Sequence, residues 1–149
     1  MRNVAVRRAT RVFITYLIAV TGAYILGVIA STQFVLAQLA ELGHGASNEL
    51  ILRTISHDIL GMAPTYGIIL LITLGIAFSV ASFIGNFFPR LRASGLVIGS
   101  GLAVVAVHLI MQEVFSISPL YSAGSMSGIL TQGFAGSVGG FFYYLMRRT

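Results

Sequence analysis

The hydrophobic residues of this chain are gathered into four long runs that are separated by short polar segments. The runs cover approximately residues 12–35, 64–87, 94–115 and 126–146. Each comes close to the ~20 apolar residues that a helix needs to cross the hydrocarbon core of a bilayer. The pattern therefore predicts an all-α integral membrane protein, a four-helix bundle that forms one transmembrane domain over residues 1–149.

The segment between the first two runs has a different pattern. Ser47 and Asn48 are residue types that cap helix N-termini, and the apolar residues after them recur at helical spacing. We therefore predict a short amphipathic helix over about 48–60, lying on the outer face of the membrane. Its apolar side holds Leu50, Ile51, Ile55 and Ile59, and its polar side holds Glu49, Arg53, Ser56 and Asp58.

The charges predict the orientation of the runs. All nine cationic side chains are arginines, and they gather before the first run, between the second and third, and after the fourth. Arg53 is the one exception. Because cytoplasmic segments of membrane proteins carry the excess of Lys and Arg, we expect both termini and the middle loop in the cytoplasm. The predicted location is the bacterial inner membrane.

Composition agrees with a membrane protein and excludes several activities. The chain is 56% hydrophobic and only 9% charged, against roughly 25% charged residues in soluble domains. It contains no cysteine, which excludes disulfides, thiolate metal sites and cysteine nucleophiles. The net charge of +5 does not indicate nucleic-acid binding, because the arginines form no stripe interleaved with exposed aromatic residues.

Small residues recur four positions apart within the runs, which is the spacing that lets membrane helices approach closely. We expect these columns to be contact faces, either inside the bundle or between protomers. Larger residues on the other faces of the fourth run are expected to point to lipid: Phe134, Phe141, Phe142, Tyr143 and Tyr144. The columns are Thr15, Ala19, Ala23, Gly27 and Ser31 in the first run, Gly95, Gly99 and Ala103 in the third, and Gly124, Gly128, Gln132, Gly136 and Gly140 in the fourth.

The candidate polar site lies in the outer half of the third run. His108 and Gln112 are one helical turn apart and share a face, whereas Glu113 points elsewhere. His57 and Asp58, at the end of the amphipathic helix, form a second candidate pair. Ionisable residues within membrane spans usually face an interior or a water-filled cavity, so these five residues are the candidates for a transport or polar site.

A metal or haem site is weakly indicated. His44, together with the histidines and carboxylates of the two candidate groups, could converge on an outer-facing pocket with ligands suited to zinc or copper. The sequence has no His-x3-His spacing, and haem held by His57 and His108 requires both imidazoles at similar depth. We predict no metal site and leave the cofactor open.

No catalytic motif is present, so the sequence does not favour an enzyme. It favours a non-catalytic integral membrane subunit or self-assembling scaffold, packed through its Gly, Ala and Ser faces. The expected partners are the lipid bilayer and either further copies of the chain or unlike subunits of a larger membrane complex. The alternative is a small channel or transporter with an outer polar vestibule at His108, Gln112 and Glu113.

Overall fold

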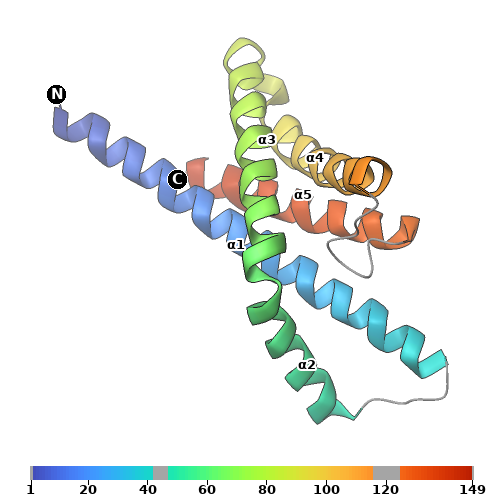
Figure 1. The fold of residues 1–149 in the computed structure, drawn as a ribbon. Helices are drawn as coiled ribbons and strands as arrows, with labels where there is room; N and C mark the ends of the chain where they lie inside the picture. The colour runs from blue at the N-terminus through green and yellow to red at the C-terminus, as the bar shows by residue number, and fades with distance from the viewer. Residues whose placement is uncertain (1, 42–46, 116–124, 149) are drawn as a thin grey trace.

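The computed structural model of the chain describes residues 2–41, 47–115 and 125–148. These residues are almost entirely helical (Figure 1), which confirms the prediction of an all-α protein. A π-helical turn, Ala63–Gly67, joins the second helix to the third, and a 3-10 turn, Pro89–Leu91, joins the third to the fourth. The helices are α1 (Arg2–Glu41), α2 (Asn48–Gly61), α3 (Ile68–Phe87), α4 (Arg92–Phe115) and α5 (Met126–Arg148).

Three helical segments are long and apolar enough to cross a membrane: Val6–Glu41, Ala63–Phe87 and Pro89–Val114. They correspond to the first three predicted runs, and a membrane location is supported to that extent. This count applies to the described residues. Helix α5 is long enough but less apolar, because glycine, serine, threonine and glutamine interrupt its hydrophobic residues. The fourth crossing therefore stays a prediction.

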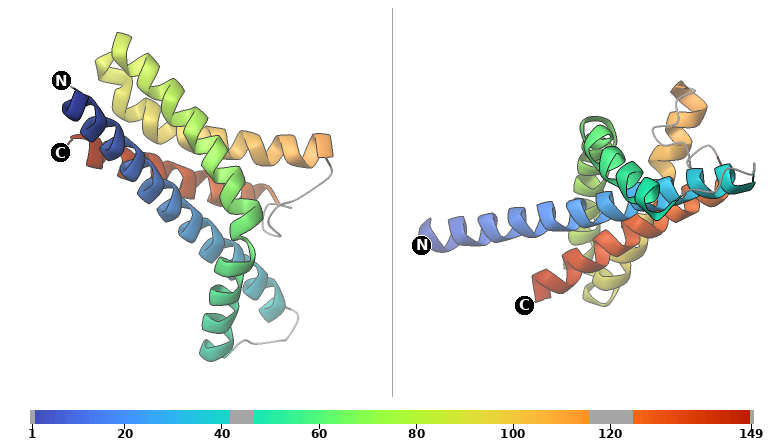
Figure 2. Two further views of the ribbon diagram at one scale, coloured as in Figure 1. Left: turned by 60° about the vertical axis from the view of Figure 1, so that its left-hand side comes forward. Right: turned by 90° about the horizontal axis from the view of Figure 1, so that it is seen from below.

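Helix α5 lies between α1 and α4, and α3 packs mainly against α4 (Figure 1). The C-terminal end of α5 lies beside the turn that joins α3 to α4, whereas the N-terminal end of α1 projects away from the other helices (Figure 2). That proximity brings basic residues together: a cavity of about 340 Å³ is lined by Arg90 and Arg92 from the turn and by Arg147 and Arg148 from the end of α5. One end of the molecule is thus strongly basic.

Helix α2 begins at Asn48, and its N-cap is Ser47, whose hydroxyl oxygen accepts a hydrogen bond of 3.3 Å from the backbone N–H of Leu50. The predicted helix and cap are confirmed. Asp58 differs from expectation, because it lies partly buried against α1, where the Thr32 hydroxyl donates a 2.8 Å hydrogen bond to its carboxylate. Asp58, which was placed on the polar side of the predicted helix, therefore also anchors α2 to α1.

The π-helical turn contains Pro64, which has no backbone N–H and therefore leaves the Leu60 carbonyl oxygen without its usual helical donor. Within the turn the carbonyl oxygen of Met62 accepts from the backbone N–H groups of Thr65, Tyr66 and Gly67, at 3.2, 2.8 and 3.4 Å. Helices α2 and α3 consequently form a bent rod (Figure 1). The turn directs the Tyr66 ring inward, where it is fully buried.

Glycines of α5 allow the backbones of α4 and α5 to come very close. A Cβ atom added at Gly140 would lie 2.2 Å from the Leu96 carbonyl oxygen, and one at Gly136 would lie 3.0 Å from the Ser100 carbonyl oxygen. On the α1 side, a Cβ at Gly139 would lie 2.9 Å from the Cβ of Ala23. All five small residues of the α1 column are buried. Gly124 lies outside the described residues.

The aromatic residues of α5 divide between surface and interior. Phe134, Phe141 and Phe142 are exposed, as expected for lipid-facing side chains. The expectation for Tyr143 was wrong: its ring is 4% exposed and stacks on Phe78 of α3, with the ring centroids 4.3 Å apart and the planes 9° from parallel. Sequence spacing alone does not reveal that α3 covers this position.

Candidate functional site

A buried polar cluster occupies the place where α1, the π-helical turn, α4 and α5 meet. The Tyr66 hydroxyl donates a 2.7 Å hydrogen bond to Oε1 of Gln132, and Nε2 of Gln132 donates a 2.9 Å bond to the carbonyl oxygen of Gly27. Tyr66 and Gln132 are both fully buried. Because a buried polar group without a partner is costly, these bonds make the cluster a specific connection between three segments of the chain.

His108 lies at the edge of this cluster and is fully buried. Its Nδ1 is 2.8 Å from the carbonyl oxygen of Val104, and because a carbonyl oxygen only accepts, Nδ1 carries the hydrogen of that bond. Nε2 has no hydrogen-bond partner among the described residues. The Tyr66 ring meets the imidazole edge-on, with centroids 5.8 Å apart. The imidazole thus serves packing and leaves one ring nitrogen without a hydrogen bond to the described residues.

The structure distributes the other candidate residues over different environments. Gln112 is partly buried on α4, and Glu113 is exposed. On α2 the side chain of His57 is 85% exposed, with its Nδ1 3.7 Å from Oδ1 of Asp58. His108 is enclosed while His57 faces outward, so the two imidazoles proposed for haem do not share an environment.

Metal ligands do not gather in the described part of the chain. Residues 2–41, 47–115 and 125–148 contain no group of three or more His, Asp or Glu side chains placed to hold a metal ion. His44 lies outside these ranges. The hydrogen bonds of the buried cluster connect helices within the described part of the chain.

Sequence reasoning missed the two tyrosines of the cluster. The Tyr66 ring lies 5.9 Å from that of Tyr24, and the Tyr24 hydroxyl donates to the carbonyl oxygen of Ile59 at the end of α2. The available signal was Pro64, since a proline at a helix junction marks an irregular turn where a nearby side chain can be redirected. The direction of that side chain could not be read from the sequence.

A second feature is an open apolar groove of about 660 Å³ between α3 and α4, called here the α3–α4 groove. A Cβ added at Gly99 would meet nothing within 4 Å, and one at Gly95 would lie 3.8 Å from the Cβ of Ala81. The column predicted for the third run thus borders a surface that the described residues leave open. The groove is lined by small residues, Ala77, Ala81, Gly95, Gly99, Ala103 and Ala106, by larger apolar residues, Ile76, Val80, Ile84, Leu91, Ile98 and Leu102, and by Ser94.

Comparison of the chain with known protein families, with characterised proteins and with solved structures finds no match. The functional conclusion therefore rests on the geometry of the molecule.

Proposed function

We propose that this chain is a non-catalytic integral membrane subunit that assembles with a second copy of itself through the α3–α4 groove. In this proposal the molecule is a four-helix membrane bundle with both termini in the cytoplasm of a bacterium. Its activity is to form an assembly within the inner membrane, with no reaction of its own.

The observation that carries the proposal is the open space beside Gly99. Membrane helices have no hydrophobic driving force between them, so they associate where small residues permit close contact. On α5 the glycines are already in contact with α4 and α1, whereas Gly99 lines a groove that none of the described residues fills. A surface of this kind is typical of a helix contact whose partner is another molecule.

The chemistry of the groove favours a second copy as that partner. Its lining contains no charged residue, and Ser94 is the one polar residue. A twofold pairing brings the same surface of each copy into contact, so the surface must be complementary to itself. An uncharged surface with a small-residue stripe satisfies this condition because pairing buries no unpaired charge.

The placement of α5 supports a fourth crossing despite its lower hydropathy. Its glycines contact α1 and α4, and Gln132 is fully buried with hydrogen bonds to Tyr66 and Gly27. A helix covered in this way can enter a bilayer because its polar groups are satisfied within the protein. The basic end formed by Arg90, Arg92, Arg147 and Arg148 supports the cytoplasmic orientation of the termini.

The channel alternative is less well supported. His108 is fully buried against the Tyr66 ring, so it does not line a water-filled vestibule in the single chain. Glu113 is exposed, and a pore that uses it would have to be built from several copies. Self-assembly is therefore required both for the proposed subunit and for a pore that uses Glu113.

Disulfide trapping tests the pairing directly, because the chain has no cysteine of its own. We expect Ser94→Cys, in the groove, to form disulfide-linked dimers when membranes are treated with a mild oxidant. Ser79→Cys, exposed on another face of α3, is the matched control and should stay monomeric. Equal crosslinking of the two variants, or none at Ser94→Cys, would contradict pairing through the groove.

A substitution in the groove supplies the complementary test. Gly99→Leu fills the open space, so we expect the dimer to dissociate while the monomer stays folded. Gly61→Leu, at a glycine on α2 whose surroundings are also open, should leave the dimer intact. Subunit counting by single-molecule photobleaching in bilayers gives the stoichiometry of each variant. Dimers that persist in Gly99→Leu would contradict the proposal.

A further inference from the structure

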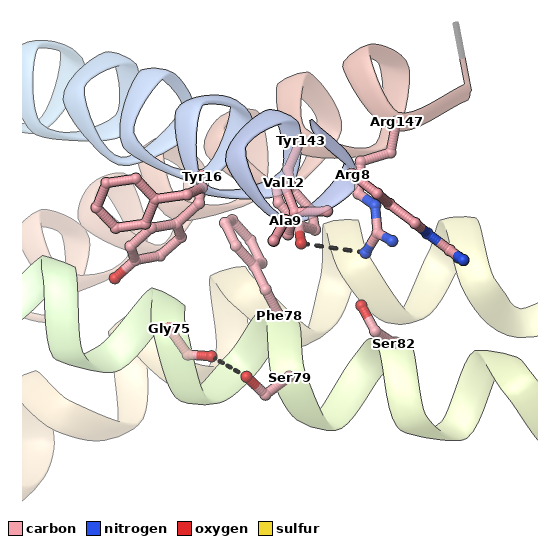
Figure 3. A pocket seen from close by; sticks show the side chains of 11 residues that line it. Arg8, Ala9, Val12, Tyr16, Gly75, Phe78, Ser79, Ser82, Tyr143 and Arg147 are labelled. Carbon is pink, nitrogen blue, oxygen red and sulfur yellow. Dashed lines mark hydrogen bonds between the residues drawn. The ribbon is translucent and has the colours of Figure 1, made fainter. Parts of the chain in front are cut away.

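A cavity lies between α1, α3 and α5, on a different side of α3 from the α3–α4 groove. Its volume is about 1220 Å³, which exceeds the roughly 300–1,000 Å³ of common ligand pockets. Most of its wall is apolar, with contributions from Val12, Phe13 and Phe78, whereas Arg8 and Arg147 line one end (Figure 3). The cavity is therefore amphipathic along its length.

Arg147 is held in place at the basic end. Its Nη1 donates a 3.2 Å hydrogen bond to the Tyr143 hydroxyl, and its guanidinium carbon lies 5.5 Å from the centre of the Tyr143 ring. Tyr143 in turn stacks on Phe78, and the Tyr16 ring meets Phe78 edge-on. This series of aromatic contacts fixes one guanidinium at the mouth of the cavity.

A buried hydroxyl belongs to the same cavity lining as the two arginines. The Oγ of Ser82 is shielded from solvent and has no hydrogen-bond partner among the described residues. Figure 3 shows it directed from α3 toward the side of the cavity where Arg8 and Arg147 lie. A buried hydroxyl without a partner is costly, so this position is suited to a polar group supplied from outside the chain.

The two arginines of the cavity favour an anionic ligand group, and its apolar wall favours a hydrocarbon chain. The eleven lining residues include two arginines and no carboxylate. From Arg8 to Tyr16 the wall extends over eight residues of α1, which is about 12 Å at 1.5 Å per residue. That length is less than half of the ~30 Å hydrocarbon core, so the cavity spans the depth of a single leaflet.

We propose that this cavity binds an acidic phospholipid from the leaflet next to the chain termini. The lipid phosphate contacts the guanidinium groups of Arg8 and Arg147 and the Ser82 hydroxyl, and an acyl chain lies along Val12, Phe13 and Phe78. This inference rests on membrane insertion of the chain but not on pairing through the α3–α4 groove. A failure of dimerisation would leave it unaffected.

Tryptophan quenching by brominated lipids tests the site, because the chain has no tryptophan of its own. Phe13→Trp places a single fluorophore in the cavity wall. The variant is reconstituted in phosphatidylcholine vesicles with a minor fraction of phosphatidylglycerol, and either the acidic or the zwitterionic lipid carries bromine. Each arginine near an anionic lipid contributes about 1 kcal/mol, so two correspond to roughly 30-fold enrichment of the acidic lipid. We expect quenching per molecule to be much stronger from brominated phosphatidylglycerol.

Two controls separate this site from general attraction of acidic lipid. Phe134→Trp, on an exposed position of α5 away from the cavity, should be quenched equally per molecule by both lipids. In the Phe13→Trp background, Arg8→Gln with Arg147→Gln should abolish the selectivity. Arg90→Gln with Arg92→Gln removes the same charge at the turn and should preserve it.

Several results would overturn the proposal. Equal quenching of Phe13→Trp by the two lipids would mean that the cavity does not select an acidic headgroup. Equal loss of selectivity in both arginine pairs would mean that the basic end attracts acidic lipid without a defined site. If an arginine variant fails to fold, quenching of Phe13→Trp alone by the two lipids still decides whether the cavity selects an acidic headgroup.

Discussion

Two adjacent faces of α4 differ in whether other helices cover them. The face with Leu96, Ser100, Val104 and His108 is fully covered by other helices, whereas the neighbouring face with Gly99 opens onto the α3–α4 groove. Glycines on both helices allow the close approach, because a Cβ added at Gly101 of α4 would lie 2.9 Å from the Gly133 carbonyl oxygen of α5. The small residues of α4 are thus divided between a contact with α5 and an open surface.

The comparison teaches that a column of small residues marks a surface able to make close contact but does not name its partner. On α5 the column contacts neighbours within the chain, while on α4 it borders open space. If the open face is also a contact, its partner belongs to another molecule. Substitutions that add one methyl group to each face separate these cases most directly.

Gly140→Ala should have the largest effect. The added Cβ would lie 2.2 Å from both the Leu96 carbonyl oxygen and the Ser100 hydroxyl oxygen, so the backbones of α4 and α5 must move apart. We expect a loss of about 3 kcal/mol in the free energy of unfolding. Reversible unfolding in mixed micelles containing SDS measures it. A variant as stable as the wild type would show that the two backbones do not come this close.

Gln132→Leu tests the one large polar residue in the α5 column. The substitution leaves the Tyr66 hydroxyl without its acceptor in the buried interior, which should cost about 2 kcal/mol of unfolding free energy. Gln33→Leu, at an exposed position on α1, is the control and should cost nothing. Similar stabilities of the two variants would indicate that the hydrogen bonds of Gln132 contribute little.

Gly27→Ala should cost about 1 kcal/mol, because the atoms it meets can shift. Its Cβ would lie 2.6 Å from Oε1 of Gln132 and 2.7 Å from the Tyr66 hydroxyl oxygen, which are both ends of side chains. In the Gln132→Leu background, Gly27→Ala should change the free energy of unfolding by a different amount than it does in the wild type. The reason is that the two sites share these contacts. Strict additivity in a double-mutant cycle would argue against a shared cluster.

Gly99→Ala should have the smallest effect on the monomer. With nothing within 4 Å of the added Cβ, we expect no loss of stability and a gain of up to about 1 kcal/mol from the higher helix propensity of alanine. The measurement is made at high dilution in detergent, where pairing is suppressed. A clear loss would mean that another part of the chain covers this face.

The helical elements could be predicted from the sequence because they depend on local patterns. The apolar runs identified three helices long enough to cross a membrane, and Ser47 marked the start of α2 through its hydroxyl cap. The burial of the α1 column also follows the spacing of its small residues. These features need no knowledge of which helix lies beside which.

The remaining features depend on which helices are neighbours. Tyr143 was expected at the lipid surface, but α3 crosses α5 there and Phe78 stacks on the ring. Tyr66 went unnoticed because its inward direction is set by the π-helical turn at Pro64. His108 was identified as a candidate, but its enclosure beside Tyr66 required the three-dimensional arrangement. Spacing along one helix contains no information about such crossings.

The length of α1 has a mechanical consequence. Its 40 residues extend about 60 Å, whereas a bilayer with its headgroup regions measures about 40–45 Å. An upright α1 would project into water at one or both ends, and keeping it within the bilayer would require a tilt of about 40–50°. The same continuous rod contacts α5 and, through Thr32, α2. A force applied to the first turns of α1 would therefore be transmitted along the continuous helix to the opposite surface of the membrane, with no flexible joint in between.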